Sequence, residues 1–279
     1  MNSKTIAAHV ELLRPLNGLM MMAVIAVAVI LAQAGVHDWM TVGIAALVGG
    51  LVGTGANAIN DYFDIDIDRV NRPDRPLPRG AVSLNAALTL WLIFSVLGIS
   101  LNVFLDWTAL CIAAFAVAIL FLYSARLKGT VLAGNLVVAF MTGLAFVYGA
   151  EVAGHPERAV LPAVFAFLVN LGREIVKDVE DMQGDLHGKA ITFPLKFGVK
   201  KSLVLATVVF VLLIGCTLAA FFWGGFNETY LVLVLIVDGM LTAGMIMFWR
   251  SQSKATLASL SNLLKLSMVV GLAAIYFGS

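Results

Sequence analysis

"INDYFDIDIDRVNRPDRPLPRG", residues 59–80, places five Asp and four Arg in a chain that is otherwise strongly apolar. Hydrophobic residues make up 61% of the 279 residues, and charged residues only 13%. Apolar segments on both sides of this stretch approach the length of about 20 residues that a membrane-spanning helix needs. The composition therefore predicts an integral membrane protein in which the charged stretch lies at the end of a span.

The apolar segments predict an all-α membrane protein with nine spans in a single domain, residues 1–279. The predicted spans are 15–34, 39–61, 82–102, 107–123, 131–150, 159–182, 199–223, 229–248 and 260–277. Basic residues gather in the connections after the second, fourth, sixth and eighth spans, whereas the connections on the opposite side contain a single basic residue, Arg158. Because basic loops stay in the cytoplasm, we expect a multi-pass protein of the cell membrane with a cytoplasmic N-terminus.

Three aspartates at the end of the second span share one helical face. Asp61, Asp64 and Asp68 have the spacing D-x2-D-x3-D, and at 100° per residue this spacing aligns their side chains. The same spacing recurs at the end of the sixth span, in residues 178–185, with Asp178, Asp181 and Asp185. Four crossings separate the two motifs, so both are expected on the cytoplasmic side.

Carboxylates gathered in this way repel one another unless a cation compensates them. Mg²⁺ prefers oxygen ligands and commonly takes one or two carboxylates from the protein and further ligands from substrate phosphates. Flanking Arg and Lys side chains suit the same phosphates. The two motifs therefore predict a site for Mg²⁺ and a diphosphate, although a single motif could equally consist of solvated charges that pair with their neighbours. For Asp66 and Glu180, which lie off the shared faces, we prefer that second interpretation.

Two other classes of membrane protein fit the sequence less well. A cation-coupled transporter places its acidic residues near the bilayer midplane on broken helices, whereas these aspartates lie at helix ends. A lipid phosphatidyltransferase of the CDP-alcohol type carries a Gly and an Ala-Arg pair in its motif, and "DYFDIDIDR", residues 61–69, lacks them.

"NDYFDIDID" (60–68), followed by "NRPDRPLPRG" (71–80) and by a second Asp-rich motif ahead of "KAITFPLKFG" (189–198), resembles the UbiA superfamily of intramembrane prenyltransferases. The resemblance covers the whole chain and implies a nine-helix bundle that binds Mg²⁺ and a prenyl diphosphate. It implies that the catalytic aspartates are Asp61, Asp64, Asp68, Asp181 and Asp185. It also implies metal ligands among Asp64, Asp68, Asp181 and Asp185, and Asp178 extends the second motif.

Three further segments resemble archaeal members of the superfamily: "LLRPLNGLM" (12–20), "YSARLKGTVLAGNLVVAFMTGLAFVYGA" (123–150) and "GREIVKDVEDMQGD" (172–185). Those members transfer the geranylgeranyl group of geranylgeranyl diphosphate to the free hydroxyl of geranylgeranylglyceryl phosphate. Prenylation of an aromatic quinone precursor is the alternative within the superfamily. The archaeal resemblance implies a prenyl diphosphate donor, a lipid-phosphate acceptor and basic residues for two anionic head groups. The expected substrate-binding residues are Arg14, Asn17, Asn57, Asn60, Arg72, Arg75, Tyr123, Lys128, Arg173, Lys177 and Lys189. The bias of basic residues toward the cytoplasm explains many of these cations without a ligand. No protein or nucleic-acid partner is expected.

Two charges inside the last two spans stand outside both motifs. An isolated charge within a span costs about 2.5 to 3.5 kcal/mol on insertion scales. We therefore expect Asp238 and Lys265 to make contact across the last helix hairpin, directly or through water. In the competing interpretation Lys265 extends toward the cytoplasm and Asp238 bonds another helix.

Overall fold

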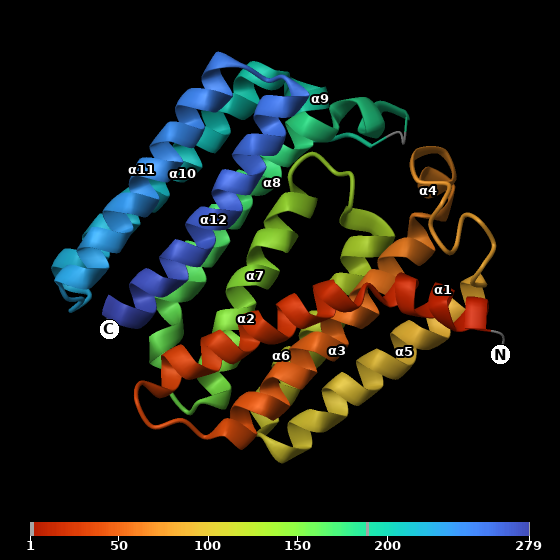
Figure 1. Ribbon diagram of the computed structural model, residues 1–279, viewed down its shortest axis with the longest axis horizontal. Helices are drawn as coiled ribbons and strands as arrows, with labels where there is room; N and C mark the ends of the chain where they lie inside the picture. The colour runs from red at the N-terminus through yellow and green to blue at the C-terminus, as the bar shows by residue number, and fades with distance from the viewer. Residues whose placement is uncertain (1–2, 188–189, 279) are drawn as a thin grey trace. The chain divides into compact units, whose positions relative to one another are not determined.

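The computed structural model describes residues 3–187 and 190–278, and the regular elements in these ranges are all helical (Figure 1). Nine helices in this described part of the chain are long and apolar enough to cross a membrane, which confirms the predicted number of spans. Contacts between residues divide the chain into two compact units: residues up to 128 with 145–159, and residues 129–144 with those from 160 onward. The single domain stays a prediction.

In the first unit, helix α3 (Trp39–Phe63) has neighbours on several sides. They include α1 (Ser3–Leu13), α2 (Pro15–Gln33), α4 (Ile65–Asn71), α5 (Leu84–Ser100) and α6 (Trp107–Leu122). Val29, Val42 and Val48 belong to the buried apolar cluster that joins α2, α3 and α6. Because α3 is enclosed in this way, its acidic end is held by the core of the unit.

The chain leaves helical geometry at Arg14, between α1 and α2. Arg14 adopts a left-handed backbone with φ 48°, and Pro15 begins α2 because a proline suits the first position of a helix. Helix α1 is missing from the sequence prediction, since it is too short and too polar for a span. Its apolar side is visible in the sequence as Ala8 and Leu12, four residues apart, which pack against Leu77 in the loop after α4.

Several helices begin at a side chain that accepts backbone N–H groups. Asp38 accepts from Met40 and Thr41 at the start of α3, and Asp106 accepts from Ala109 at the start of α6. The hydroxyl and the amide of Thr41 lower the pKa of Asp38 below its usual value. These caps fix the ends of the spans at short turns.

In the second unit, α8 packs against α10 and α12, and α11 packs against both α10 and α12. The buried core includes Ile175, Phe210, Leu241 and Leu260. The elements are the first part of α7 (Ala133–Val152), α8 (Val160–His187), α9 (Phe193–Phe197), α10 (Val199–Trp223), α11 (Glu228–Arg250) and α12 (Lys254–Gly278). Helix α12 begins six residues before the predicted ninth span.

The structure has no direct contact between Asp238 and Lys265, and that part of the prediction is wrong. Asp238 is buried and accepts a hydrogen bond from Thr217 Oγ1 of α10, at 3.1 Å from Oδ1. Lys265 is exposed on α12 and makes no ion pair with any described residue. The competing interpretation, in which Asp238 bonds another helix, matches the structure. Asp238 faces α10, and the position of a residue along a helix does not predict which neighbouring helix its side chain faces.

Candidate active site

The three aspartates of the first motif converge at the end of α3. Helix α3 ends at Phe63, yet the backbone bonds from Asp64 N to Asn60 O (3.0 Å) and from Asp68 N to Asp64 O (2.8 Å) carry the helical spacing into α4. Asp61, Asp64 and Asp68 are all buried, and one carboxylate oxygen from each lies within 4.8 Å of the others. The predicted shared face is therefore present in the fold.

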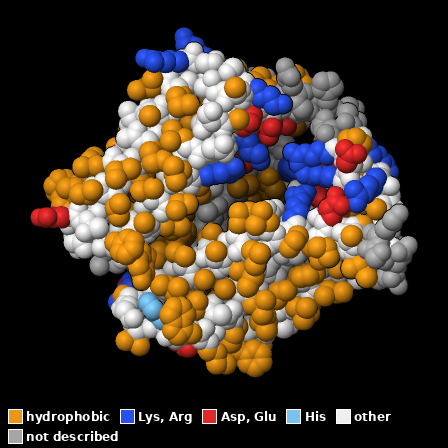
Figure 2. Space-filling view, in the orientation of Figure 1, with side chains coloured by type: hydrophobic (Ala, Val, Ile, Leu, Met, Phe, Trp, Pro, Cys, Tyr) orange, Lys and Arg blue, Asp and Glu red, His pale blue; other side chains and the backbone are white. Residues whose placement is uncertain are grey.

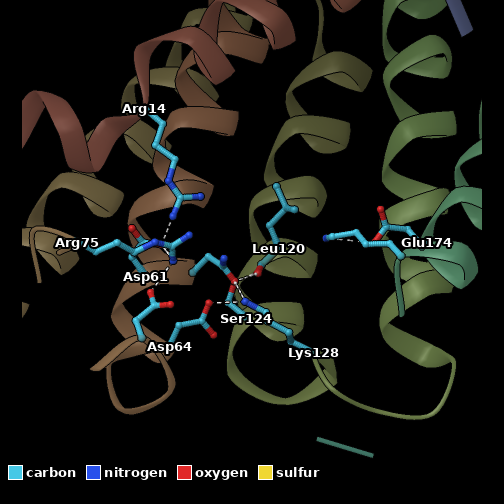
Figure 3. Close-up of polar contacts among 11 residues, drawn as sticks. Arg14, Asp61, Asp64, Arg75, Leu120, Ser124, Lys128 and Glu174 are labelled. Atoms are coloured by element: carbon cyan, nitrogen blue, oxygen red, sulfur yellow. Dashed lines mark hydrogen bonds and ion pairs between the residues drawn. The ribbon is translucent and has the colours of Figure 1, made fainter. Parts of the chain in front are cut away.

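Two arginines from separate segments meet Asp61, as Figure 3 shows. Arg14, at the turn between α1 and α2, donates from Nη2 to Asp61 Oδ1. Arg75, in the loop after α4, donates from Nη1 to Asp68 Oδ2 at 2.5 Å and to Asp61 Oδ1 at 3.3 Å. The left-handed backbone of Arg14 thus has a role, since it ends α1 and turns the chain at the residue whose side chain contacts Asp61.

Lys128 supplies the third cation. Its Nζ forms an ion pair with Asp64 Oδ2 and donates to Asn60 Oδ1 at 3.3 Å. A π-helical turn, Tyr123–Leu127, precedes it, closed by the bond from Lys128 N to Tyr123 O at 2.9 Å. Single π-turns inside α-helices occur frequently at functional sites. Here the turn ends α6 directly before the lysine that contacts the motif.

Each buried carboxylate of the first motif thus has a cationic partner from another segment. Figure 2 shows the acidic and basic side chains gathered over α4, whereas hydrophobic side chains cover most of the rest of the first unit's visible face. The donor set fits a hard divalent cation, because three carboxylates offer oxygen ligands within one small space. It also fits a diphosphate, because Arg and Lys side chains lie beside those ligands.

The second motif lies on α8 in the other unit, where its aspartates differ in burial. Asp178 is half-buried and accepts a hydrogen bond from Asn135 Nδ2 of α7 at 2.8 Å. Asp185 is also half-buried, and Asp181 is exposed. Asp181 is therefore accessible on the surface of α8, whereas one carboxylate oxygen of Asp178 already accepts a hydrogen bond from an amide.

Sequence reasoning missed Glu174, which is only 8% exposed. Arg173 Nη1 donates to Glu174 Oε1 at 2.8 Å, and Lys177 Nζ lies 3.8 Å from Glu174 Oε2. Glu174 precedes Asp178 by four residues and so lies near the same helical face. That spacing was the signal available in the sequence.

The remaining predicted site residues differ in exposure. Arg72 is exposed at the end of α4, while Asn17 and Asn57 are half-buried in α2 and α3. Tyr123 is half-buried in the π-helical turn. Lys189 lies outside the described residues.

The sequence is similar to a known protein family and to named proteins within it. Residues 20–269 match the UbiA prenyltransferase family model. Digeranylgeranylglyceryl phosphate synthase of Methanothermobacter thermautotrophicus is 33% identical over 97% of this chain and 95% of its own length. The protein of the same name from Thermococcus kodakarensis is 36% identical over 98% of both chains.

Two solved structures have folds similar to this one. A structure of digeranylgeranylglyceryl phosphate synthase is 32% identical, with a TM-score of 0.86 over 98% of both chains. A UbiA homolog from Archaeoglobus fulgidus, bound to GPP and Mg²⁺, has a TM-score of 0.72 at 19% identity and covers 96% of this chain and 99% of its own. The second likeness is one of fold alone.

Proposed function

Because this chain belongs to the UbiA prenyltransferase family, we propose that it transfers a geranylgeranyl group from geranylgeranyl diphosphate to the free hydroxyl of geranylgeranylglyceryl phosphate. The predicted UbiA fold and the prenyltransferase class are confirmed by that membership and by the structural likeness. The choice of substrates is supported by relatives that are 31% to 41% identical and carry the synthase name.

The observation that carries the proposal is the cluster of Asp61, Asp64 and Asp68 with its cationic partners. These carboxylates would hold Mg²⁺, whose chemistry is to neutralise negative charge on the diphosphate oxygens. Asp181, Asp185 and Asp178 are proposed as further ligands for the same reaction. A buried set of oxygen donors and a ring of basic side chains are the two halves of a diphosphate site.

The side chains of the chain itself serve the departing group. Arg14, Arg75 and Lys128 would leave their carboxylates and donate hydrogen bonds to the diphosphate as its negative charge grows. The bond between C1 of the donor and the diphosphate oxygen breaks, the acceptor oxygen forms an ether bond to C1, and the hydroxyl proton is released. Donors that strengthen their bonds only as the leaving group departs lower the barrier rather than merely tightening binding.

The placement in the cell is part of the proposal. The chain is a multi-pass membrane protein, and the cluster of basic loops supports an active site on the cytoplasmic side of the cell membrane. Asn17, Asn57, Asn60, Arg72, Tyr123, Arg173, Lys177 and Lys189 are proposed as further substrate-binding residues.

The test is an assay with purified protein and labelled geranylgeranyl diphosphate. Geranylgeranylglyceryl phosphate, 4-hydroxybenzoate and a naphthoate are offered as acceptors in parallel. We expect a labelled ether product with the lipid phosphate only, loss of transfer in EDTA, and recovery when Mg²⁺ is added. Alkylation of an aromatic acceptor alone would overturn the substrate assignment, and full activity in EDTA would overturn the metal.

A further inference from the structure

A pair of cations on α8 is held by a carboxylate that lies outside both aspartate motifs. Each oxygen of Glu174 faces one cation: Oε1 accepts from Arg173 at 2.8 Å, and Oε2 lies 3.8 Å from Lys177 Nζ. Figure 3 labels Glu174 and marks one contact of its side chain with a dashed line. Arg173 is 23% exposed and Lys177 48%, so both cations also face outward from the helix.

Arg173 has bonding capacity that the protein does not use. Its Nε is buried and has no hydrogen-bond partner among the described residues. An unpaired buried donor costs about 1 to 3 kcal/mol unless a ligand fills the role. The bias of basic residues toward cytoplasmic loops does not explain this arginine, because it lies inside α8 beside a buried acid and not in a loop.

The charges around Glu174 differ in kind from those of the first motif. There, three buried carboxylates that can share a cation have three cationic partners. On α8, the single carboxylate of Glu174 has two cationic partners, Arg173 and Lys177. The next acid along the helix, Asp178, accepts a hydrogen bond from the amide of Asn135. The first arrangement suits a metal ion together with a diphosphate. The second pairs one carboxylate with two cations, one of which has an unused donor, and suits an anion that arrives without a metal.

We propose that Arg173 and Lys177 bind the phosphate monoester of the acceptor without a metal ion, and that Glu174 is the positioning residue that holds the two cations for it. The inference rests on the proposed function, because that reaction requires a second anionic head group besides the diphosphate. The guanidinium can present two N–H groups to a phosphate, while the ammonium adds a point charge. Glu174 fixes both side chains before the acceptor arrives, which reduces the ordering cost of binding.

The decisive experiment compares two acceptors that differ only in the phosphate, geranylgeranylglyceryl phosphate and geranylgeranylglycerol. Arg173→Ala is expected to lower kcat/KM for the phosphorylated acceptor about 10- to 150-fold, the range of a lost hydrogen bond to a charged group. The same variant leaves kcat/KM for geranylgeranylglycerol unchanged. An equal loss with both acceptors would overturn the assignment, because the residue would then not recognise the phosphate.

Glu174→Gln separates positioning from a structural role. It keeps the shape of the side chain and removes the charge that holds the two cations. We expect the KM for the phosphorylated acceptor to rise roughly 2- to 10-fold, with kcat and the KM for the donor unchanged. A fall in kcat with both acceptors, together with loss of folded protein, would instead make Glu174 a structural residue and refute its positioning role.

A binding experiment tests the phosphate site even if the protein does not turn over geranylgeranylglyceryl phosphate. Wild-type protein in EDTA is titrated with geranylgeranylglyceryl phosphate by calorimetry, beside Arg173→Ala, Lys177→Ala and the matched control Lys200→Ala. Lys200 is an exposed lysine near the start of α10, so its variant should bind like wild type, whereas the other two should bind more weakly. Binding to wild type that needs Mg²⁺, or equal binding to all four proteins, would overturn the inference. Binding without transfer would count against the proposed function alone.

Discussion

Replacing Lys128 by Met should distinguish the partner of this lysine in the free protein, Asp64, from the partner proposed for the reaction, the diphosphate. Asp64 is 5% exposed, and its Oδ2 forms an ion pair with Lys128 Nζ. Met has a similar length and keeps most of the packing, but it removes the ammonium. In the variant, the three carboxylates retain two cations, Arg14 and Arg75.

The magnitude follows from burial and exposure. A buried polar group that loses its partner costs about 1 to 3 kcal/mol. Lys128 is 38% exposed, so water can take its place beside Asp64 in part, and we expect the lower half of that range. A hydrogen bond between charged groups in the reaction is worth about 1.5 to 3 kcal/mol, which corresponds to roughly a 10- to 150-fold loss of kcat/KM for the donor.

The assay measures unfolding in detergent and turnover, each for Lys128→Met, wild type and the matched control Lys200→Met. In EDTA the free energy of unfolding of Lys128→Met should fall by about 1 to 2 kcal/mol, and Mg²⁺ should restore most of it because the ion replaces the missing positive charge. Turnover should stay low with or without that rescue. Two results would refute the reasoning: turnover within about twofold of wild type, well short of the loss expected from a charged hydrogen bond, or a stability loss that Mg²⁺ does not reverse.

Three further changes have defined outcomes. Asp181→Ala should abolish transfer with no change in thermal unfolding, because this side chain is exposed; an active variant would remove it from the proposed metal ligands. Thr217→Val should lower the free energy of unfolding by about 1 to 3 kcal/mol, since it removes the hydroxyl that donates to the buried Asp238. This loss should be smaller in an Asp238→Asn background. Additive losses would show that the two residues act separately. Gly172→Ala should also destabilise, by about 1 to 3 kcal/mol, because the added Cβ would meet the ring of Phe210 in the core; unchanged thermal unfolding would mean that the ring moves aside freely.

The sequence supported the nine spans and the first aspartate cluster because both rest on strong local patterns. Apolar length identifies a span, and the spacing of Asp61, Asp64 and Asp68 brings their carboxylates together whether or not the helix has a brief interruption. These features depend on residues that are close in the chain.

The features that sequence reasoning missed depend on contacts between distant residues or on backbone geometry. The pairing of Lys128 with Asp64 joins residues 64 positions apart, and the π-helical turn before Lys128 is defined by a hydrogen bond that no residue type specifies. Glu174 stands between Arg173 and Lys177 and four residues before Asp178, but its burial depends on how α8 packs, which the sequence pattern does not give. The expected contact of Asp238 with Lys265 failed because depth along a helix does not give rotation about it.

Under the proposed function, the paired charges at the end of α3 allow the protein to fold without the divalent metal that its reaction needs. Asp61, Asp64 and Asp68 already have cationic partners within the chain, so newly synthesised protein can enter the bilayer and mature before it meets the ion. The proposed Mg²⁺ would then serve the reaction of the diphosphate and would not be required for folding. Under that proposal, a cell short of magnesium would accumulate folded but inactive protein, and lipid synthesis would resume on resupply without new translation.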